Sequence, residues 1–372
     1  MKELSYNEYY NKVLGSWIGR IAGDFIGAPV ELKSQKYIKS KYGKINYYIE
    51  PVDLKYVNDD EMYEIVALIA LEKYGIDLTA KNIAQEWINL LKNESFIFTA
   101  EKIAFNNLKS NIWPPKSGIL NNFYYDFIGA QMRADIWGQI TPGCPEIAKC
   151  YAEMDGSISH YSIGVEGEVF IASLISQAFF ETNINQNILK AINLIYPDEE
   201  SLYLQMIKKS IKLYEQYPKN YKKARNILIR SYWKKEIIKQ LIDSNTDFPI
   251  ERNIILNSTV GGVHVLPNIG IIILSLLYGM NNKEDPLGRS ICIAAMMGLD
   301  TDCNCGNIGA IIGAQLGAKK IPPKWKEPLQ NTFSTYVKGY EKWKISDLAQ
   351  RITKIGEIVV KQKAHNIVIK RE

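Results

Sequence analysis

Cysteine and histidine are scarce in this 372-residue sequence, which holds five cysteines and three histidines. A disulfide framework needs paired cysteines, and a zinc site needs cysteine or histidine at short, regular spacings. The cysteines here are odd in number and irregularly spaced, at Cys144, Cys150, Cys292, Cys303 and Cys305. The sequence therefore argues against a disulfide scaffold and against a cysteine-based zinc site.

An excess of one charge sign is also lacking, because 45 Lys and Arg residues against 40 Asp and Glu residues give a net charge of only +5. Basic residues are spread along the chain, which does not favour nucleic-acid binding. The longest apolar run, residues 269–280, is shorter than the ~18 residues of a membrane span, and the N-terminus lacks the apolar segment of a signal peptide. We therefore expect a cytoplasmic protein with no nucleic-acid or membrane partner. Nothing in the sequence indicates an oligomeric state.

Alternating strand patterns are rare, whereas amphipathic patterns with helical spacing recur. The spacing predicts helices at residues 6–25, 61–74, 79–91, 99–108, 124–136, 145–154, 162–180, 187–195, 199–217, 267–278, 287–297, 302–316 and 345–360. Only residues 45–49 and 365–369 resemble strands. The chain is 47% hydrophobic and has no Pro- or Ser-rich linker. We therefore expect an all-α protein, a single large helical domain over residues 1–372 with at most a minor β ribbon.

Glycine recurs in two of the predicted helices at intervals of three or four residues. The first stripe is Gly15, Gly19, Gly23 and Gly27, and the second is Gly306, Gly309, Gly313 and Gly317. Each glycine inside a helix costs roughly 1 kcal/mol relative to alanine. We expect close packing of the two helices to offset this cost and to bring the acidic residues at their ends together.

Acidic residues gather at three predicted helix ends. One carboxylate suffices to cap a helix, so capping does not explain why aspartates occur in pairs. Crowded carboxylates raise one another's pKa unless a cation is present. Oxygen ligands with few histidines point to Mg²⁺, Mn²⁺ or Ca²⁺ rather than zinc. The groups are Asp24 with Glu31, Asp59 with Asp60 and Glu61, and Asp300 with Asp302.

At these residues the sequence resembles the ADP-ribosylglycohydrolases. Residues 15–31 are similar to the family's opening glycine helix with its G-D-x-x-G-x-x-x-E ending. Residues 58–61 (NDDE) stand where the family has T-D-D-T, and residues 298–303 (GLDTDC) stand where it has G-G-D-T-D-T. Residues 128–133 resemble its G-A-x-M-R segment, and residues 158–161 its T-H segment. The resemblance is strongest over residues 10–325, which leaves residues 326–372 as a C-terminal helical extension.

The resemblance implies an orthogonal helical bundle that holds two Mg²⁺ or Mn²⁺ ions and cleaves an ADP-ribosyl bond at C1″. Two such ions can orient the ribose diol and lower the pKa of a water molecule. The implied metal ligands are Asn58, Asp59, Asp60, Asp300, Asp302 and Cys303. The implied catalytic residues are Glu31, Asp59 and Asp60. The implied contacts to ADP-ribose or an ADP-ribosylated substrate are Gly129, Ala130, Met132, Arg133 and His160, with backbone N–H groups near Gly129 facing the diphosphate.

Two positions depart from the family pattern. Asn58 replaces a threonine but still offers an amide oxygen, whereas Cys303 replaces a threonine with a thiol that suits Mg²⁺ poorly. We expect Cys303 either to stand off the metal or to mark a divergent site. Three functions stay open: an ADP-ribosyl hydrolase, a non-catalytic ADP-ribose binder, and a hydrolase of a smaller nucleoside or N-glycoside. Trp113, Tyr124 and Tyr125 are further candidates for a nucleotide pocket, and His264 for a structural role.

Overall fold

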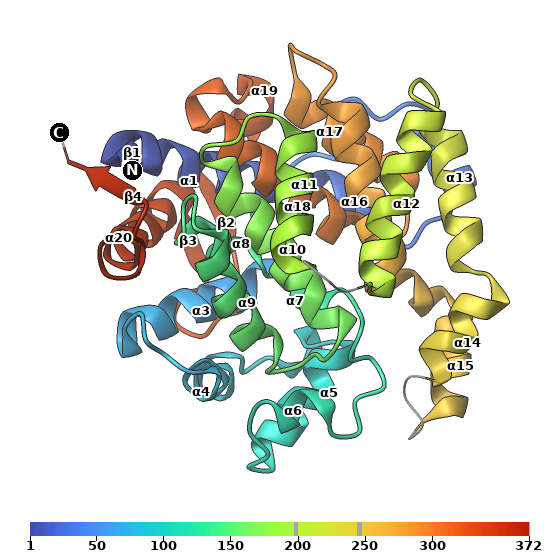
Figure 1. The fold of residues 1–372 in the computed structure, drawn as a ribbon, viewed down its shortest axis with the longest axis horizontal. Helices are drawn as coiled ribbons and strands as arrows, with labels where there is room; N and C mark the ends of the chain where they lie inside the picture. Colours follow the sequence, from blue (N-terminus) through green and yellow to red (C-terminus); the bar gives the residue numbers. More distant parts are fainter. Residues whose placement is uncertain (197–199, 244–247, 372) are drawn as a thin grey trace.

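Helices dominate the computed structural model of the protein, which describes residues 1–196, 200–243 and 248–371 (Figure 1). The α-helices within these ranges are α1 (Tyr6–Gly27), α2 (Gln35–Tyr42), α3 (Asp60–Tyr74), α4 (Ala80–Leu90), α5 (Thr99–Lys109), α6 (Lys116–Ile119), α7 (Gly129–Met132), α8 (Asp135–Gln139), α9 (Pro145–Gly156), α10 (Ile163–Ala178), α11 (Ile184–Ile195), α12 (Leu202–Gln216), α13 (Tyr221–Tyr232), α14 (Lys235–Asp243), α15 (Pro249–Leu256), α16 (Val265–Gly279), α17 (Pro286–Met297), α18 (Thr301–Leu316), α19 (Pro323–Lys326) and α20 (Ile345–Lys363). The predicted all-α bundle is confirmed. None of these helices combines the length and apolar composition needed to cross a membrane.

Four short strands and two isolated β-bridges, Val57 with Ser334 and Phe127 with His264, form the β structure of the described residues. The strands are β1 (Lys2–Ser5), β2 (Thr332–Ser334), β3 (Lys342–Lys344) and β4 (Ile367–Lys370). β1 pairs with β4 in parallel, so the two ends of the chain lie side by side next to α20 (Figure 1). β2 pairs with β3 in an antiparallel ribbon. The minor β content that the sequence predicts is therefore present, with β4 close to the predicted strand.

Two sequence predictions of local structure are wrong. Residues 124–136 do not form one helix, because the chain turns at residue 126 and hydrogen-bonds to the segment before α16. Ile128 N–H donates to the Val263 carbonyl, and Val265 N–H donates to the Asp126 carbonyl. Residues 45–49 form no strand, since Tyr48 instead packs on Trp325 and donates a hydrogen bond to its carbonyl at 2.6 Å.

Six α-helices of the described residues were not predicted from the sequence: α2, α6, α13, α14, α15 and α19. Of these, α13, α14 and α15 occupy the side of the molecule opposite the chain ends (Figure 1). They follow α12, whose predicted start at residue 199 lies outside the described residues. In α13 the buried residues Ala224, Leu228 and Tyr232 follow one another at four-residue intervals, so the helical period was present in the sequence and was missed. The other predicted helices are present, with ends that differ by a few residues.

The two glycine stripes pack α1 against α18, as the sequence predicts. A Cβ atom on Gly19 would overlap the carbonyl of Gly309, and one on Gly23 would overlap the carbonyl of Cys305. The glycines therefore permit backbone contact between helices that lie nearly 300 residues apart in the chain. This contact sets the end of α1 beside the start of α18, where the paired aspartates lie.

We expect Gly309→Ala to destabilise the protein by about 1–3 kcal/mol, because the new methyl group meets the backbone of Gly19, which cannot move aside. Alanine's higher helix propensity offsets only part of this cost. Chemical denaturation followed by circular dichroism measures the change. Gly262→Ala is the control, since a Cβ there meets only the ends of two flexible side chains, Leu32 at 3.3 Å and Leu299 at 3.7 Å. Equal stability of Gly309→Ala and the parent would contradict the packing argument.

Candidate metal centre and substrate cavity

A cavity of about 510 Å³ opens at the N-terminal end of α18, where the acidic residues meet. Its wall comes from the residues after α1, the loop before α3, the start of α5, α7 and the start of α18. Eight of the residues that the sequence singled out line it: Glu31, Asn58, Asp59, Gly129, Met132, Asp300, Asp302 and Cys303. A volume of this size suits a small-molecule ligand.

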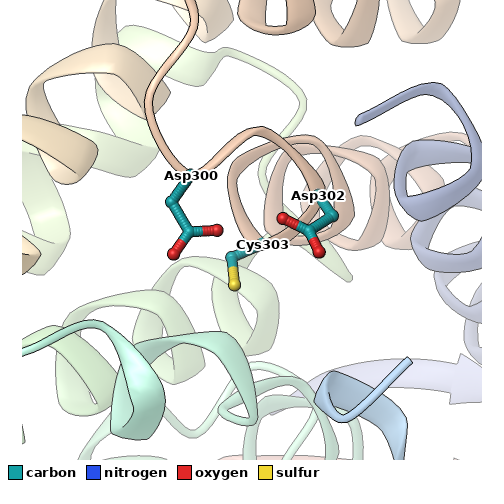
Figure 2. Close-up of side chains that lie close together, drawn as sticks. All are labelled: Asp300, Asp302 and Cys303. Carbon is teal, nitrogen blue, oxygen red and sulfur yellow. The ribbon is translucent and has the colours of Figure 1, made fainter. Parts of the chain in front are cut away.

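Asp300, Asp302 and Cys303 converge on one point of the cavity wall. Figure 2 shows their side chains directed toward one another from the loop before α18 and from its first turn. One potential ligand atom from each residue lies within 4.8 Å of the others, and all three residues are buried. Neither Oδ1 of Asp300 nor Oδ1 of Asp302 has a hydrogen-bond partner. Buried carboxylate oxygens without partners are costly, so this arrangement fits a bound divalent cation.

Asp300 owes its position to the turn before it and to a side chain of α16. The chain turns through left-handed backbone at Gly298 (φ 73°) and Leu299 (φ 72°). Asn268 Oδ1 then accepts hydrogen bonds from the Asp300 N–H at 3.3 Å and from Asn304 Nδ2 at 2.7 Å. Leu32 N–H donates to the Leu299 carbonyl at 2.8 Å, which places Glu31 beside the same loop. Sequence reasoning missed Asn268, because it lies in a long apolar helix away from any acidic group.

Asn58 and Cys303 occupy their expected positions but make hydrogen bonds within the site. Asn58 Nδ2 donates to Asp302 Oδ2 at 3.4 Å, so the amide group of Asn58 is a hydrogen-bond donor to this carboxylate. The Cys303 thiol donates to Asp60 Oδ1 at 3.3 Å. Burial, followed by the charge of Asp300, raises the pKa of the Cys303 thiol well above its usual value. The thiol is thus a proton donor in the metal-free site.

The carboxylates of the cavity are electrostatically crowded. The charge of Asp302, followed by burial, raises the pKa of Glu31 to about 7. Burial and then Asp302 raise the pKa values of Asp59 and of Asp300 well above the usual range. The charge of Asp302 therefore contributes to the raised pKa of all three of these acidic neighbours. A cation at this position would relieve the repulsion of all of them.

We expect the metal-free protein to lose stability as the pH rises from about 5 to about 8. The pKa values of Glu31 and Glu101 are both raised to about 7 from 4.5, that of Glu101 chiefly by burial. Between these values the folded state binds more protons than the unfolded state, so the free energy of unfolding falls with rising pH. Melting temperatures in EDTA and in Mg²⁺ test this, and the stabilisation by Mg²⁺ should grow with pH. A melting temperature in EDTA that rises over this range would contradict the assignment.

Arg133 and His160, which the resemblance places at the substrate, lie behind the cavity wall. Arg133 donates to Asp155 at 2.7 Å and to Glu101 at 3.0 Å. His160 Nδ1 lies 2.8 Å from Ser159 Oγ, and burial lowers the pKa of this histidine well below its usual value. Ala130 is also fully buried and lies outside the cavity wall. The group that reaches the cavity from this network is Glu101, which sequence reasoning missed because it stands alone in an ordinary amphipathic helix.

Glu101 lies directly against Gly129. A Cβ atom on Gly129 would overlap the Glu101 carboxylate. This close approach explains why position 129 is a glycine, and it places a carboxyl group in the cavity wall there. α7, which begins at Gly129, is only four residues long.

The aromatic part of the cavity wall differs from the sequence prediction. Tyr56, Phe96 and Phe98 line the cavity. Trp113, Tyr124 and Tyr125 are not among its lining residues, and Tyr125 instead stacks on the Arg252 guanidinium. His264 caps α16 by accepting from the Leu266 N–H at 3.2 Å, which is the structural role expected for it.

Comparison with known proteins identifies the family of the chain and the fold that it shares. The family described as ADP-ribosylglycohydrolase matches residues 5–359, which includes most of α20. A protein of Archaeoglobus fulgidus, described only as an uncharacterized protein, is 25% identical over 325 residues, or 84% of this chain and 90% of its own. A solved structure titled "ADP-ribosylglycohydrolase-related protein complex" has a TM-score of 0.59 at 15% identity, over 94% of this chain and 99% of that one. The chain therefore belongs to the ADP-ribosylglycohydrolase family.

Proposed function

We propose that the protein is a divalent-metal-dependent hydrolase that cleaves the C1″ bond between an ADP-ribosyl group and a nitrogen or oxygen acceptor. The observation that carries the proposal is the pair of unpartnered, buried carboxylate oxygens of Asp300 and Asp302 in the wall of a ligand-sized cavity. Glu31 and Asp59 line the same cavity. Family membership supports a hydrolase, and the donor set supports Mg²⁺ or Mn²⁺.

Asp300 and Asp302 would hold the cation, with Asp59 and Glu31 next to them. When bound, such an ion supplies charge neutralisation and Lewis-acid polarisation at the reacting sugar. Glu31 is the residue that we assign to proton transfer, because its carboxyl group lines the cavity beside Asp300 and Asp302 and is only half-buried, whereas those two aspartates are buried. The apolar wall formed by Met132, Phe98 and Val260 would exclude water from the sugar face.

A second candidate is hydrolysis of a smaller nucleoside or N-glycoside. The observation that favours it is the charge of the cavity wall, which carries five carboxylates, while none of its described lining residues is Lys, Arg or His. A diphosphate would find no cationic side chain there, and Glu101 lies beside Gly129, where the resemblance places the diphosphate. A neutral glycoside meets no such repulsion.

Release of the free sugar product distinguishes these functions. The purified protein with Mg²⁺ or Mn²⁺ would be incubated with ADP-ribosyl-arginine, ADP-ribosyl-serine, and unphosphorylated nucleosides, and the products separated by chromatography. Metal-dependent release of ADP-ribose supports the first proposal, and release of ribose from nucleosides alone supports the second. Binding of ADP-ribose without release from any substrate would show a non-catalytic binder and overturn both proposals.

A further inference from the structure

Arg20 is a buried cation directly behind the candidate metal centre. It lies on α1, is fully shielded from solvent, and is surrounded by four carboxylates from α1, α3 and α8. Its Nε contacts Asp135 Oδ2 at 2.8 Å, and its Nη1 contacts Asp60 Oδ2 at 3.0 Å. Glu64 and Asp24 lie at 3.7 and 3.8 Å. The guanidinium also donates to the Met132 carbonyl, so it is held from several sides.

Both oxygens of Asp60 are already engaged. Oδ2 accepts from Arg20, and Oδ1 accepts from the Cys303 thiol at 3.3 Å. Asp60 is fully buried and does not line the cavity. Displacing the Arg20 guanidinium from Oδ2 would be costly because it leaves buried charges uncompensated. A cation that took Asp60 as a ligand would therefore have to approach Oδ1, where the Cys303 thiol now donates its hydrogen bond. Asp60 is therefore not an open ligand, unlike Asp300 and Asp302.

We propose that Arg20 takes the place of one of the two cations that the family pattern implies, so that the centre binds a single exchangeable divalent ion on the Asp300 and Asp302 side. The inference rests on the metal dependence proposed above. The Arg20 guanidinium supplies permanent positive charge to Asp60, and the Cys303 thiol completes the hydrogen bonding of that carboxylate. The single ion then faces the cavity with Glu31 and Asp59 around it.

Binding of Mn²⁺ to the protein after removal of metals with EDTA tests the proposal. Calorimetric titration gives the number of ions per chain, and electron paramagnetic resonance distinguishes an isolated Mn²⁺ from a spin-coupled pair. We expect one ion per chain and an isolated-ion spectrum. Two ions per chain or a coupled spectrum would overturn the single-ion proposal, including the case of a second ion at the unpartnered Asp24 and Glu61 oxygens. Absence of binding would overturn the metal dependence itself.

A matched pair of charge-removing variants locates the ion. We expect Asp300→Asn to weaken Mn²⁺ binding by about tenfold or more, because it removes an open ligand. Asp60→Asn should weaken Mn²⁺ binding much less than Asp300→Asn does, because Asp60 faces Arg20 and not the ion. Equal losses in the two variants would overturn the proposal.

The charge of Arg20 can be removed directly. Arg20→Met keeps a long side chain but leaves Asp60 without its cation, so we expect this variant to bind a second Mn²⁺. Arg351→Met is the control, since Arg351 pairs with Glu72 at the partly exposed surface, far along the chain from the centre. A folded Arg20→Met variant that still binds one ion would overturn the proposal. If the variant does not fold, the parent stoichiometry and the Asp60→Asn comparison decide the matter.

Discussion

Replacing Asp302 by alanine is expected to lower turnover by about a thousandfold or more while raising the stability of the metal-free protein. The activity falls because Asp302 offers an unpartnered buried oxygen to the cation, and metal assistance contributes several kcal/mol to such reactions. The stability rises because the charge of Asp302 is the largest cause of the raised pKa of Glu31 and also raises the pKa of Asp59. Opposite effects on activity and stability distinguish a functional site from a structural one.

Product release with Mg²⁺ and thermal unfolding in EDTA measure the two effects in parallel. Asp302→Asn is the matched variant, because it removes the charge but keeps an oxygen that can accept from Asn58. It should show the same loss of activity. Turnover near the parent level in either variant, with the fold intact, would remove Asp302 from the metal site.

Arg252→Met is expected to destabilise the protein by about 3–5 kcal/mol, the range for breaking a buried ion pair. Arg252 holds Asp126 through two hydrogen bonds of 2.7 and 2.6 Å, and both side chains are fully buried. His264 Nε2 lies 3.1 Å from the same carboxylate. Burial raises the pKa of Asp126, but His264 and Arg252 outweigh it and hold this pKa well below its usual range. Loss of Arg252 would leave a buried charge without its main partner.

The Arg252 ion pair also positions part of the cavity. Asp126 precedes the segment of Ile128 and Gly129, which hydrogen-bonds to the residues before α16. Urea unfolding measures the stability change. The control is Arg371→Met, which removes an exposed pair with Glu357 and should change the stability far less. Similar costs for the two variants would show that burial of the Arg252 pair has no special weight.

The helical fold could be predicted because the apolar period and the glycine stripes are local or repeated signals. The sequence showed that two helices must approach closely, and Gly19 and Gly309 meet as that argument requires. The break at residue 126 could not be predicted, since it depends on Arg252 and His264, which are distant in the chain. The prediction of a strand at residues 45–49 was wrong because the aromatic residues of this segment pack on Trp325, and its backbone does not pair with another strand.

The acidic part of the site could be predicted from pairs of aspartates at helix ends, and Asp59, Asp300 and Asp302 all line one cavity. The partners of each carboxylate could not be predicted, because a ligand and a salt-bridged residue look alike in a sequence. In the sequence Arg20 is a basic residue between Gly19 and Ile21, with nothing beside it that indicates its partner. In the structure its Nη1 lies 3.0 Å from Asp60 Oδ2. Asn268 and Glu101 likewise become significant only through residues that the fold brings near them.

The contact of α1 with α18 has a consequence for how the chain is made. Thr301 follows Gly27 by 274 positions, so at ~5–20 residues per second the ribosome takes roughly 15–55 s to deliver the partner of α1. During this interval the nascent chain carries a helix whose glycine face lacks its partner, although the carboxylates that surround Arg20 have already been synthesised. The aspartates at 300 and 302 emerge together with that partner. Burial of the glycine face of α1 and assembly of the acidic cavity are thus late events of synthesis, and a chain arrested before residue 300 has neither.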